Sequence, residues 1–472
     1  YMSAIALSAD LPGLRYEGHG AVSAGASSRL LFDYPEPQRS QLLDFLFLPK
    51  HGANLHVCKV EIGGDTQSTD GTEASHRHSR DDLSCSRGYE FWLMSEARRR
   101  NPAVVVQGLP WGAPGWVNNQ SASGLYGDDM LEYMTSWVRC ADVHGVSVDW
   151  LGLWNEKFAA HPTPAGYVKQ LRAALDAAGF PDTKLVLVDG YVPGESHPLW
   201  QAAEHDANFN ASFEAVGAHY PCTHVGLNSS RLRGHYGKAL WASEDWWSKG
   251  DWGGAACLAK LLNQNFLRMN ISSTLVWSML WSPYNAPHID PFQGQGWGPG
   301  LAYAWQPWSG AYNVTPAVWA MAHTTQARPA PRPRPHHRTT SLPTCTQFVR
   351  PGWRMLYAAS GALDRGGSYV SYVSPEGDDL AVVVETARAE CDHCAFNSST
   401  YAREPQLLKL SLRGALARHA ALRVWRSNAS AQFVRLPDLS RDQGHDGHEG
   451  PTFSLTVQPG ALYTLTSTEG QQ

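Results

Sequence analysis

Short apolar runs alternate with longer helical patterns between residues 17 and 326. Segments such as "AGYVKQLRAALDAAG" repeat apolar residues at three- and four-residue intervals, as amphipathic helices do. Near-continuous apolar runs separated by such helices predict a parallel (β/α)8 barrel, because strands covered by helices on the outside are apolar on both faces. The runs predicted as barrel strands span residues 18–25, 53–65, 103–111, 148–154, 183–190, 213–220, 238–244 and 273–281.

The pattern changes after residue 347. Segments such as "GGSYVSYVSPEGDDLAVVVETA" and "TFSLTVQPGALYTLTS" alternate apolar and polar positions and are interrupted by Gly, Pro and Asp. This pattern predicts an antiparallel β-sandwich over residues 348–472, with residues 1–16 pairing with it. The proline- and arginine-rich residues 327–347 are expected to be a linker or an insertion. The expected fold class is therefore α/β plus all-β, a TIM barrel followed by a β-sandwich.

Charge and hydropathy argue against nucleic-acid binding and against a transmembrane segment. The formal net charge is −5 and there is no long basic run, so nucleic-acid binding is not expected. The longest uncharged stretch, Met269–Ile289, contains Asn, Ser, Pro and His and is a poor membrane span, so a protein without a transmembrane segment is expected. Charged residues make up only 17% of the chain, and it has 19 tryptophans. Indole rings stack on sugar faces, although most of these tryptophans should lie in the core.

Cysteines and glycosylation sequons favour the secretory pathway, where disulfides can form. The one C-x-x-C, Cys391 to Cys394, has no second pair at zinc-site spacing, so neither a metal nor another cofactor is expected. No signal peptide is visible at "YMSAIALSADLPG", which suits a mature form or a fragment. The sequons begin at Asn119, Asn210, Asn228, Asn270, Asn313, Asn397 and Asn428.

Two glutamates follow apolar runs that contain tryptophan. Glu156 comes directly after "LGLWN" and Glu244 directly after "ALWAS". These runs are the fourth and seventh predicted strands, and active-site residues of a (β/α)8 barrel lie at the carboxyl ends of its strands. We therefore expect the two carboxyl groups to face each other across the barrel mouth.

A pair of carboxyl groups about 5–5.5 Å apart is what a retaining glycosidase requires. One carboxylate attacks the anomeric carbon, and the other protonates the leaving oxygen and then activates water. Each glutamate alone is more simply explained by a salt bridge at a strand end. The two together, with tryptophans alongside, favour catalysis. Asn155, next to Glu156, fits a donor to the sugar 2-OH.

Several longer segments carry a resemblance that covers nearly the whole chain in order. They include "VEIGGDTQSTDGTEASH", "GLPWGAPGW", "GLWNE", "GAHYP" and "SEDWW". Together they resemble glycoside hydrolase family 59, the galactocerebrosidase family of lysosomal retaining β-galactosidases. The resemblance implies hydrolysis of the β-galactosyl bond of galactosylceramide and related galactolipids, with a saposin-like lipid-presenting protein as a further partner. It places the protein in a lysosome, in another acidic compartment of the secretory pathway, or outside the cell.

The same resemblance assigns roles to individual residues. Glu156 matches the acid/base of the family and Glu244 its nucleophile. Thr69, Trp111 and Asn155 match its galactose contacts, although without the resemblance a local turn hydroxyl would be the favoured explanation of Thr69 and core packing that of Trp111. Trp277 is expected either to line the floor of the site or to lie in the strand core. The resemblance also supports a disulfide between Cys257 and Cys394.

Three departures from the family pattern stand out. Where the family has a galactose-contacting arginine this chain has Phe396, and Arg403 is the nearest possible replacement. Residues 327–347 interrupt a link that is short in the family. The family has a C-terminal lectin-like domain, which is not expected in this sequence, since it ends with the sandwich at Gln472. Two alternatives therefore stay open: a retaining β-glycosidase for soluble β-galactosides or another glycolipid, and a non-catalytic sugar-binding barrel.

The roles of the two glutamates also lead to an expectation about pH. Leu153 and Trp154 precede Glu156, so we expect an apolar setting that raises the pKa of Glu156 while Glu244 stays ionised. The expected activity profile is bell-shaped with an acidic optimum, at roughly pH 4–5.5.

Overall fold

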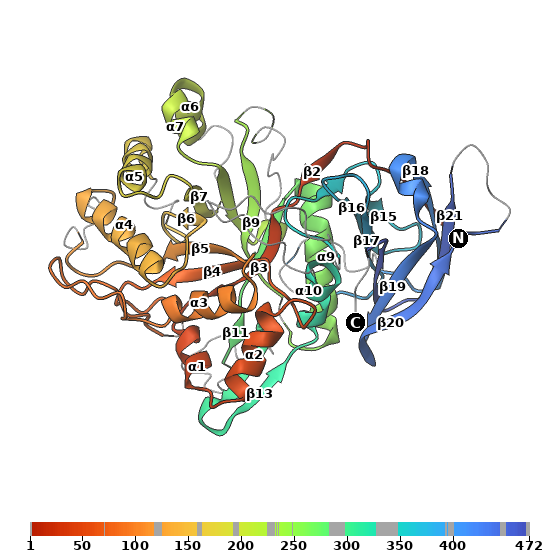
Figure 1. Ribbon diagram of the computed structural model, residues 1–472, viewed down its shortest axis with the longest axis horizontal. Coiled ribbons are helices and arrows are strands. Elements are labelled where there is room, and N and C mark those ends of the chain that lie inside the picture. The colour runs from red at the N-terminus through yellow and green to blue at the C-terminus, as the bar shows by residue number, and fades with distance from the viewer. Residues whose placement is uncertain are drawn as a thin grey trace, which may run out of the picture.

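The computed structural model describes residues 2–69, 71–117, 125–157, 163–191, 198–223, 232, 234, 236–247, 249–282, 298–326, 348–391, 394, 401–443 and 450–468. The chain forms a barrel domain and a β-sandwich side by side (Figure 1). The expected linker at residues 327–347 lies outside the described residues.

Eight parallel strands form the predicted closed barrel. They are hydrogen-bonded in the cyclic order β10-β3-β4-β5-β6-β7-β8-β9. Nearly every residue of these strands is buried, as expected for a sheet whose inner face is filled by side chains and whose outer face is covered by helices. The strands are β3 (Gly18–Ser23), β4 (Val57–Ile62), β5 (Val105–Pro110), β6 (Trp150–Gly152), β7 (Lys184–Gly190), β8 (Ala215–His219), β9 (Ala239–Asp245) and β10 (Ser273–Val276).

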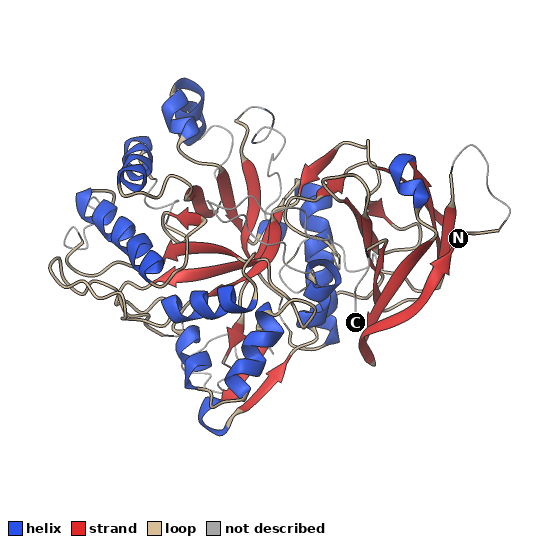
Figure 2. Cartoon of the chain, in the orientation of Figure 1, coloured by secondary structure: helices blue, strands red, loops and turns tan. Residues whose placement is uncertain are grey.

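Helices surround the barrel, as Figure 2 shows. In α4, for example, Tyr133, Trp137 and Cys140 are buried at three- and four-residue spacing, so one face of the helix covers the strands. The helices are α1 (Ser27–Asp33), α2 (Gln38–Phe47), α3 (Glu90–Arg100), α4 (Asp128–Val143), α5 (Ala165–Ala177), α6 (Pro198–His205), α7 (Ala207–Ala211), α9 (Trp252–Met269) and α10 (Ala317–Thr325). No helix in the described ranges is both long and apolar enough to cross a membrane.

The apolar run 273–281 contributes to two sheets rather than one. Its first part is barrel strand β10, which ends at Val276. Its last two residues form β11 (Leu280–Trp281), which pairs with β12 (Ala302–Gln306), and β12 pairs in turn with β13 (Ala311–Val314). The prediction of a single long strand was therefore wrong, because the chain leaves the barrel wall after Val276 to build a small sheet at its rim.

The second domain is a β-sandwich. One sheet runs β2-β14-β16-β17-β22-β19-β20, with β15 paired to β16, and the other runs β1-β18-β21. Strand β1 joins β18 in parallel and β2 joins β14 antiparallel, so the first residues of the chain belong to the sandwich. The strands are β1 (Met2–Ser8), β2 (Gly13–Arg15), β14 (Arg354–Leu356), β15 (Gly361–Ala362), β16 (Ser368–Val373), β17 (Leu380–Glu385), β18 (Gln406–Arg413), β19 (Ala421–Asn428), β20 (Ala431–Ser440), β21 (Thr452–Val457) and β22 (Ala461–Thr466).

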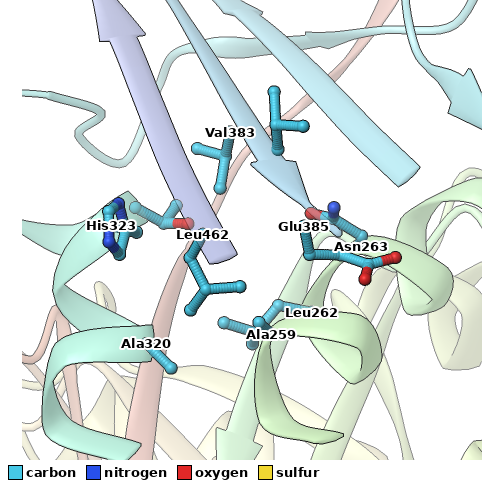
Figure 3. Close-up of a pocket in the computed structure, with 10 residues that line it drawn as sticks. Ala259, Leu262, Asn263, Ala320, His323, Val383, Glu385 and Leu462 are labelled. Carbon is cyan, nitrogen blue, oxygen red and sulfur yellow. The ribbon is translucent and has the colours of Figure 1, made fainter. Parts of the chain in front are cut away.

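Helices α9 and α10 join the two domains. Asn263 of α9 donates to Ser368 Oγ (3.1 Å), and the ring nitrogens of His323 in α10 lie 2.9 Å from Thr464 and Ser427 hydroxyls of the sandwich. A small cavity of about 10 Å³ lies between the domains, and Glu385 lines it (Figure 3). Paired polar groups therefore hold the barrel and the sandwich together.

Candidate active site

Glu156 and Glu244 meet at the carboxyl ends of the barrel strands. Glu156 follows β6, the fourth strand, and Glu244 lies near the end of β9, the seventh. One carboxylate oxygen of each lies within 4.8 Å of the other. Inversion requires a gap of about 6.5–9.5 Å that holds a water molecule, so this spacing suits a retaining displacement.

The two carboxyl groups have different surroundings. The side chain of Glu156 is 50% exposed, whereas Glu244 is 4% exposed. Tyr220, at the end of β8, donates its hydroxyl to Glu244 Oε1, and its backbone N–H donates to the carbonyl of Glu244 (2.8 Å). Glu244 Oε2 is buried and has no hydrogen-bond partner among the described residues.

His219 lies between the two glutamates. Its Nδ1 is 3.1 Å from Glu156 Oε1 and 3.8 Å from Glu244 Oε1, and its Nε2 is 3.1 Å from Asp189 Oδ1. Burial lowers the pKa of this imidazole, but the carboxylates of Glu244, Asp189 and Glu156 outweigh burial and raise the pKa to about 9. The ring is therefore protonated and donates a hydrogen bond from each nitrogen.

A buried ion pair lies next to His219 inside the barrel. Lys59 Nζ donates to Asp189 Oδ1 (2.8 Å) and to the carbonyl of Ser243 (2.9 Å), and both charged side chains are 0% exposed. Gln107 donates to the second oxygen of Asp189 (3.3 Å). Although burial raises the pKa of Asp189, Lys59 and His219 lower it to about 2. Asp189 is thus a fixed carboxylate that holds the His219 ring in place.

The expected apolar setting of Glu156 was wrong. Leu153 and Trp154 are buried, but the chain turns at Glu156, whose φ of 53° is left-handed, and the carboxylate points toward His219 and solvent. The hydrogen bond from His219 lowers the pKa of Glu156 below its ordinary value. The largest effect on the pKa of Glu156 therefore comes from a residue 63 positions away, and not from the apolar residues that precede it.

A metal ion could in principle bind between the glutamates and the histidine. One ligand atom each of Glu156, His219 and Glu244 lies within 4.8 Å of the others. A metal needs an unprotonated imidazole nitrogen. Here Nδ1 carries a proton shared with a carboxylate and Nε2 donates to Asp189, so the donor set suits a hydrogen-bonded triad rather than a cation.

Three of the four predicted sugar contacts lie at this end of the barrel. The Trp111 ring is partly exposed and lies 5.5 Å from Lys59 Nζ, and Trp277 is buried in the same aromatic cluster of the barrel interior. Asn155 is held by its backbone N–H on the carbonyl of Pro110 (2.9 Å), and its side-chain oxygen is buried with no partner among the described residues.

Thr69 and Arg403 are less clearly connected to the glutamates. Thr69 is exposed on the loop after β4, and its carbonyl accepts from the Gln67 side chain (2.9 Å). The Arg403 guanidinium lies 5.4 Å from the Tyr401 ring and lines a groove made of sandwich residues. Phe396 lies outside the described residues, so whether an arginine from the sandwich reaches the sugar stays an open expectation.

The predicted Cys257–Cys394 disulfide was wrong. Cys257 of α9 is bonded to Cys391, and Cys394 is bonded to Cys222, which follows β8. The barrel and the sandwich are indeed tied by disulfides, but by two, each using one cysteine of the C-x-x-C. The third bond, Cys85–Cys140, joins the loop after β4 to α4, and Cys58 is a buried free thiol.

Four of the glycosylation candidates fall in the described ranges. Asn313 is exposed on β13, whereas Asn270, Asn428 and Asn210 are partly buried. The Asn428 side-chain oxygen accepts a hydrogen bond from the backbone N–H of Ser430 (3.0 Å) and so stabilises a turn. Asn119, Asn228 and Asn397 lie outside the described residues.

Sequence reasoning did not assign roles to Lys59, Asp189, His219 and Tyr220. Each is a polar residue in or directly after a barrel strand, in "CKVEI", "LVLVDG" and "GAHYP". A charged residue inside an otherwise apolar strand was the available signal, because burial of an unpaired charge is costly and demands a partner.

Comparison with known proteins gives two family matches and several relatives. The model described as "Glycosyl hydrolase family 59" matches residues 16–326, and "Glycosyl hydrolase family 59 central domain" matches residues 356–472. Galactocerebrosidase of Danio rerio is 37% identical over 96% of this chain and 63% of its own length, and that of Homo sapiens is 35% identical over 96% and 61%. The chain spans less than two thirds of the length of these curated relatives.

Solved structures with the same fold come from more distant proteins. SrfJ from Salmonella typhimurium aligns with a TM-score of 0.68 over 99% of this chain and 92% of that one, at 14% identity. The catalytic domain of GH30 xylanase C from Talaromyces cellulolyticus aligns with a TM-score of 0.67 over 98% of this chain and 99% of that one, also at 14% identity. At this identity the likeness establishes the fold alone.

Proposed function

The chain belongs to glycosyl hydrolase family 59, and from this membership and the geometry of the barrel mouth we propose that it is a retaining β-galactosidase acting on galactosylceramide and related galactolipids. The products are galactose and ceramide. The observation that carries the proposal is the approach of Glu156 and Glu244 to within 4.8 Å at the carboxyl ends of two barrel strands. The substrate class comes from the relatives, which are galactocerebrosidases.

In the first step, the Glu244 carboxylate attacks the anomeric carbon of galactose. A glycosyl ester forms, the bond from the anomeric carbon to the ceramide oxygen breaks, and Glu156 passes to that oxygen the proton that it receives through its hydrogen bond with His219 Nδ1. The hydrogen bond from Tyr220 holds one oxygen of Glu244, which leaves Oε2 to make the new bond. The buried position of Glu244 supports this division of roles, because a desolvated carboxylate fixed by donors is preorganised for attack.

In the second step, the Glu156 carboxylate takes a proton from water, which attacks the same carbon. The glycosyl ester breaks, galactose leaves with its original anomeric configuration, and both glutamates return to their starting states. The half-exposed position of Glu156 supports this role, because water must reach it. Asn155, Trp111 and Trp277 are proposed to bind the sugar, with the unpartnered oxygen of Asn155 available to a sugar hydroxyl.

We further propose that the protein works in an acidic compartment of the secretory pathway such as the lysosome. The three disulfides among the described residues require an oxidising environment during folding. A saposin-like lipid-presenting protein is a candidate partner, an expectation that rests on the resemblance to the family.

The proposal is tested by comparing substrates that differ in the sugar and in the aglycone. The enzyme should release 4-nitrophenol from the β-galactoside much faster than from the β-glucoside, and should release galactose from galactosylceramide in mixed micelles. Proton NMR of the first product should show the β-anomer. Equal turnover of both nitrophenyl glycosides would contradict the assignment of galactose as the sugar. Release of α-galactose as the first product would contradict the retaining mechanism. Sugar binding without turnover would favour the non-catalytic sugar-binding alternative.

A further inference from the structure

Two tryptophans project from the small sheet at the barrel rim. Trp308, in the 3-10 helix Pro307–Ser309 between β12 and β13, is 73% exposed, and Trp305 on β12 is 46% exposed. Phe32 of α1 is 39% exposed, and α1 lies against this 3-10 helix. Figure 1 shows β13 beside α1 and α2 at one edge of the barrel. Exposed tryptophans this close together are unusual on a surface that faces only water.

We propose that the end of this hairpin (Ala302–Val314) that carries Trp305 and Trp308 is a docking surface for a lipid bilayer that contains the substrate, which requires Asn313 on β13 to carry no glycan. The inference rests on the proposed function, because it gives a lipid substrate a place from which to enter. Tryptophan suits the boundary between water and lipid, since its ring is apolar and its N–H can still donate to polar head groups.

The charge distribution favours lipid over a protein partner. Residues 301–314 contain no Asp, Glu, Lys or Arg, so no charge has to be desolvated when the hairpin enters a bilayer. Four charged side chains on α1, on α2 and between these helices form two ion pairs, Arg29 with Asp33 (2.8 Å) and Arg39 with Glu36 (3.0 Å). The hairpin is therefore uncharged, and the charges of the neighbouring α1–α2 segment are paired. Such a surface is expected to bind a membrane of neutral glycolipids.

The hairpin is also held rigidly. Tyr34 at the end of α1 donates its hydroxyl to the carbonyl of Ala311 (2.8 Å), and Tyr312 donates to Gln41 of α2 (2.8 Å). Tyr303 on β12 donates to the carbonyl of Gly298 (2.6 Å). Trp305 and Trp308 are thus presented on a fixed support, so little conformational entropy is lost when they bind.

Aromatic side chains connect the hairpin to the catalytic site. The Tyr303 ring lies 6.1 Å from the Trp305 ring and packs in the same cluster as Trp281, Trp277 and Trp111. This cluster extends to the barrel interior next to the glutamates. The hairpin is therefore joined to the barrel interior by packed aromatic side chains.

The test uses the full chain and sucrose-loaded vesicles of phosphatidylcholine with galactosylceramide. The double variant Trp305→Ser/Trp308→Ser should sediment with the vesicles about tenfold less than the parent, and hydrolyse vesicle-bound galactosylceramide about tenfold more slowly. Its hydrolysis of 4-nitrophenyl β-galactoside should stay within about twofold. The variant Trp305→Phe/Trp308→Phe should keep most of the sedimentation, because the apolar area is retained.

Val143 provides a matched control. It is as exposed as Trp308, at 73%, but it ends α4, at the opposite end of the barrel from the mouth. Val143→Ser should sediment like the parent. Sedimentation of the serine double variant equal to that of the parent would overturn the proposal, as would a defect seen only when a lipid-presenting protein is added. If the parent protein does not hydrolyse the soluble substrate, the proposed function is wrong. The sedimentation experiment would still test vesicle binding in that case.

Discussion

His219 and Glu156 share a hydrogen bond across the barrel mouth, with Nδ1 3.1 Å from Oε1. His219 comes from the end of the sixth barrel strand and Glu156 from just after the fourth. The imidazole is protonated, with its pKa raised to about 9, and it lowers the pKa of Glu156. The proton that the proposed acid must deliver is therefore one hydrogen bond away in the free site, on the ring rather than on the carboxyl group.

Replacing this imidazole should shift the titration of Glu156. In His219→Gln the hydrogen bond from a cation is lost, so the pKa of Glu156 should rise toward its ordinary value. Carbon-13 NMR of the Glu156 carboxyl, and the pH profile of kcat/KM for a β-galactoside with a poor leaving group, should both move to higher pH. His205→Gln, a change at an exposed helix end, should leave both unchanged. An unmoved Glu156 titration in His219→Gln would mean that another group lowers this pKa.

The two glutamates should respond differently to substitution. Glu244→Gln should lower kcat about 10 000-fold or more on every substrate, because the nucleophile is lost. Glu156→Gln should slow galactosylceramide hydrolysis about 100- to 1000-fold and should slow glycosylation by 4-nitrophenyl β-galactoside far less, since nitrophenolate leaves without a proton. Pre-steady-state bursts with the nitrophenyl substrate separate the two steps. Equal losses on both substrates in Glu156→Gln would contradict its role as the acid.

Tyr220→Phe should weaken catalysis without unfolding the protein. The hydroxyl donates to Glu244 Oε1, so its removal leaves that oxygen unfixed at the moment of attack. We expect kcat to fall about 10- to 100-fold, as for the loss of one preorganised donor. Thermal unfolding monitors the fold. A large drop in Tm with unchanged kcat would show that the hydroxyl serves packing alone.

The pairing of the cysteines can be tested by proteolysis of the unreduced protein. An endoprotease that cleaves before Asp392 separates Cys391 from Cys394, so each should be recovered from the unreduced protein in a different linked peptide, with Cys257 and Cys222 respectively. Cys222→Ser/Cys394→Ser should cost about 2–4 kcal/mol of unfolding free energy. Recovery of Cys257 linked to Cys394 would contradict the pairing seen here.

Stability should depend on pH through Glu385 at the junction of the domains. Burial raises the pKa of Glu385 to about 8 from 4.5, against the opposing effects of Lys260 and a hydrogen bond from Ser368. The folded protein therefore keeps a proton that the unfolded chain releases, and this contribution to stability is complete below pH 4.5 and lost as the pH rises toward 8. His323, across the same cavity, has its pKa lowered to about 3 by burial, so it is neutral over this range.

The variant Glu385→Gln should consequently stabilise the protein at pH 7 by on the order of 2–3 kcal/mol, and change little at pH 4.5. Urea unfolding at both pH values measures the difference. Glu376→Gln, at an exposed position of the same domain, is the matched control. An equal effect of Glu385→Gln at both pH values would show that the charge of Glu385 is not the cause.

The barrel and the position of its two glutamates could be predicted because both follow from local patterns. Eight apolar runs set the strand count, and Glu156 and Glu244 lie at the carboxyl ends of two of them. The buried network could not be predicted in the same way. Lys59, Asp189 and His219 lie 130 and 30 positions apart, and only closure of the barrel brings them together.

The pKa of Glu156 and the disulfides could not be predicted for a related reason. Trp154 is two residues before Glu156 in sequence, yet the chain turns at Glu156 with a left-handed φ, and the carboxylate is half exposed and lies against His219. Cys391 and Cys394 are three residues apart, and a pattern of spacing cannot decide which of them reaches Cys257. Both outcomes depend on the direction of one or two side chains, which periodicity does not determine.

The strand β1 has a consequence for the order in which the protein is made. Its buried face, including Ile5 and Leu7, belongs to the core of the sandwich, and its partner β18 begins at Gln406. During synthesis the ribosome therefore releases this strand some 400 residues before its partner, and the whole barrel emerges between them. A nascent chain stalled before β18 would carry an exposed, aggregation-prone strand ahead of its barrel, whether or not the barrel had already folded.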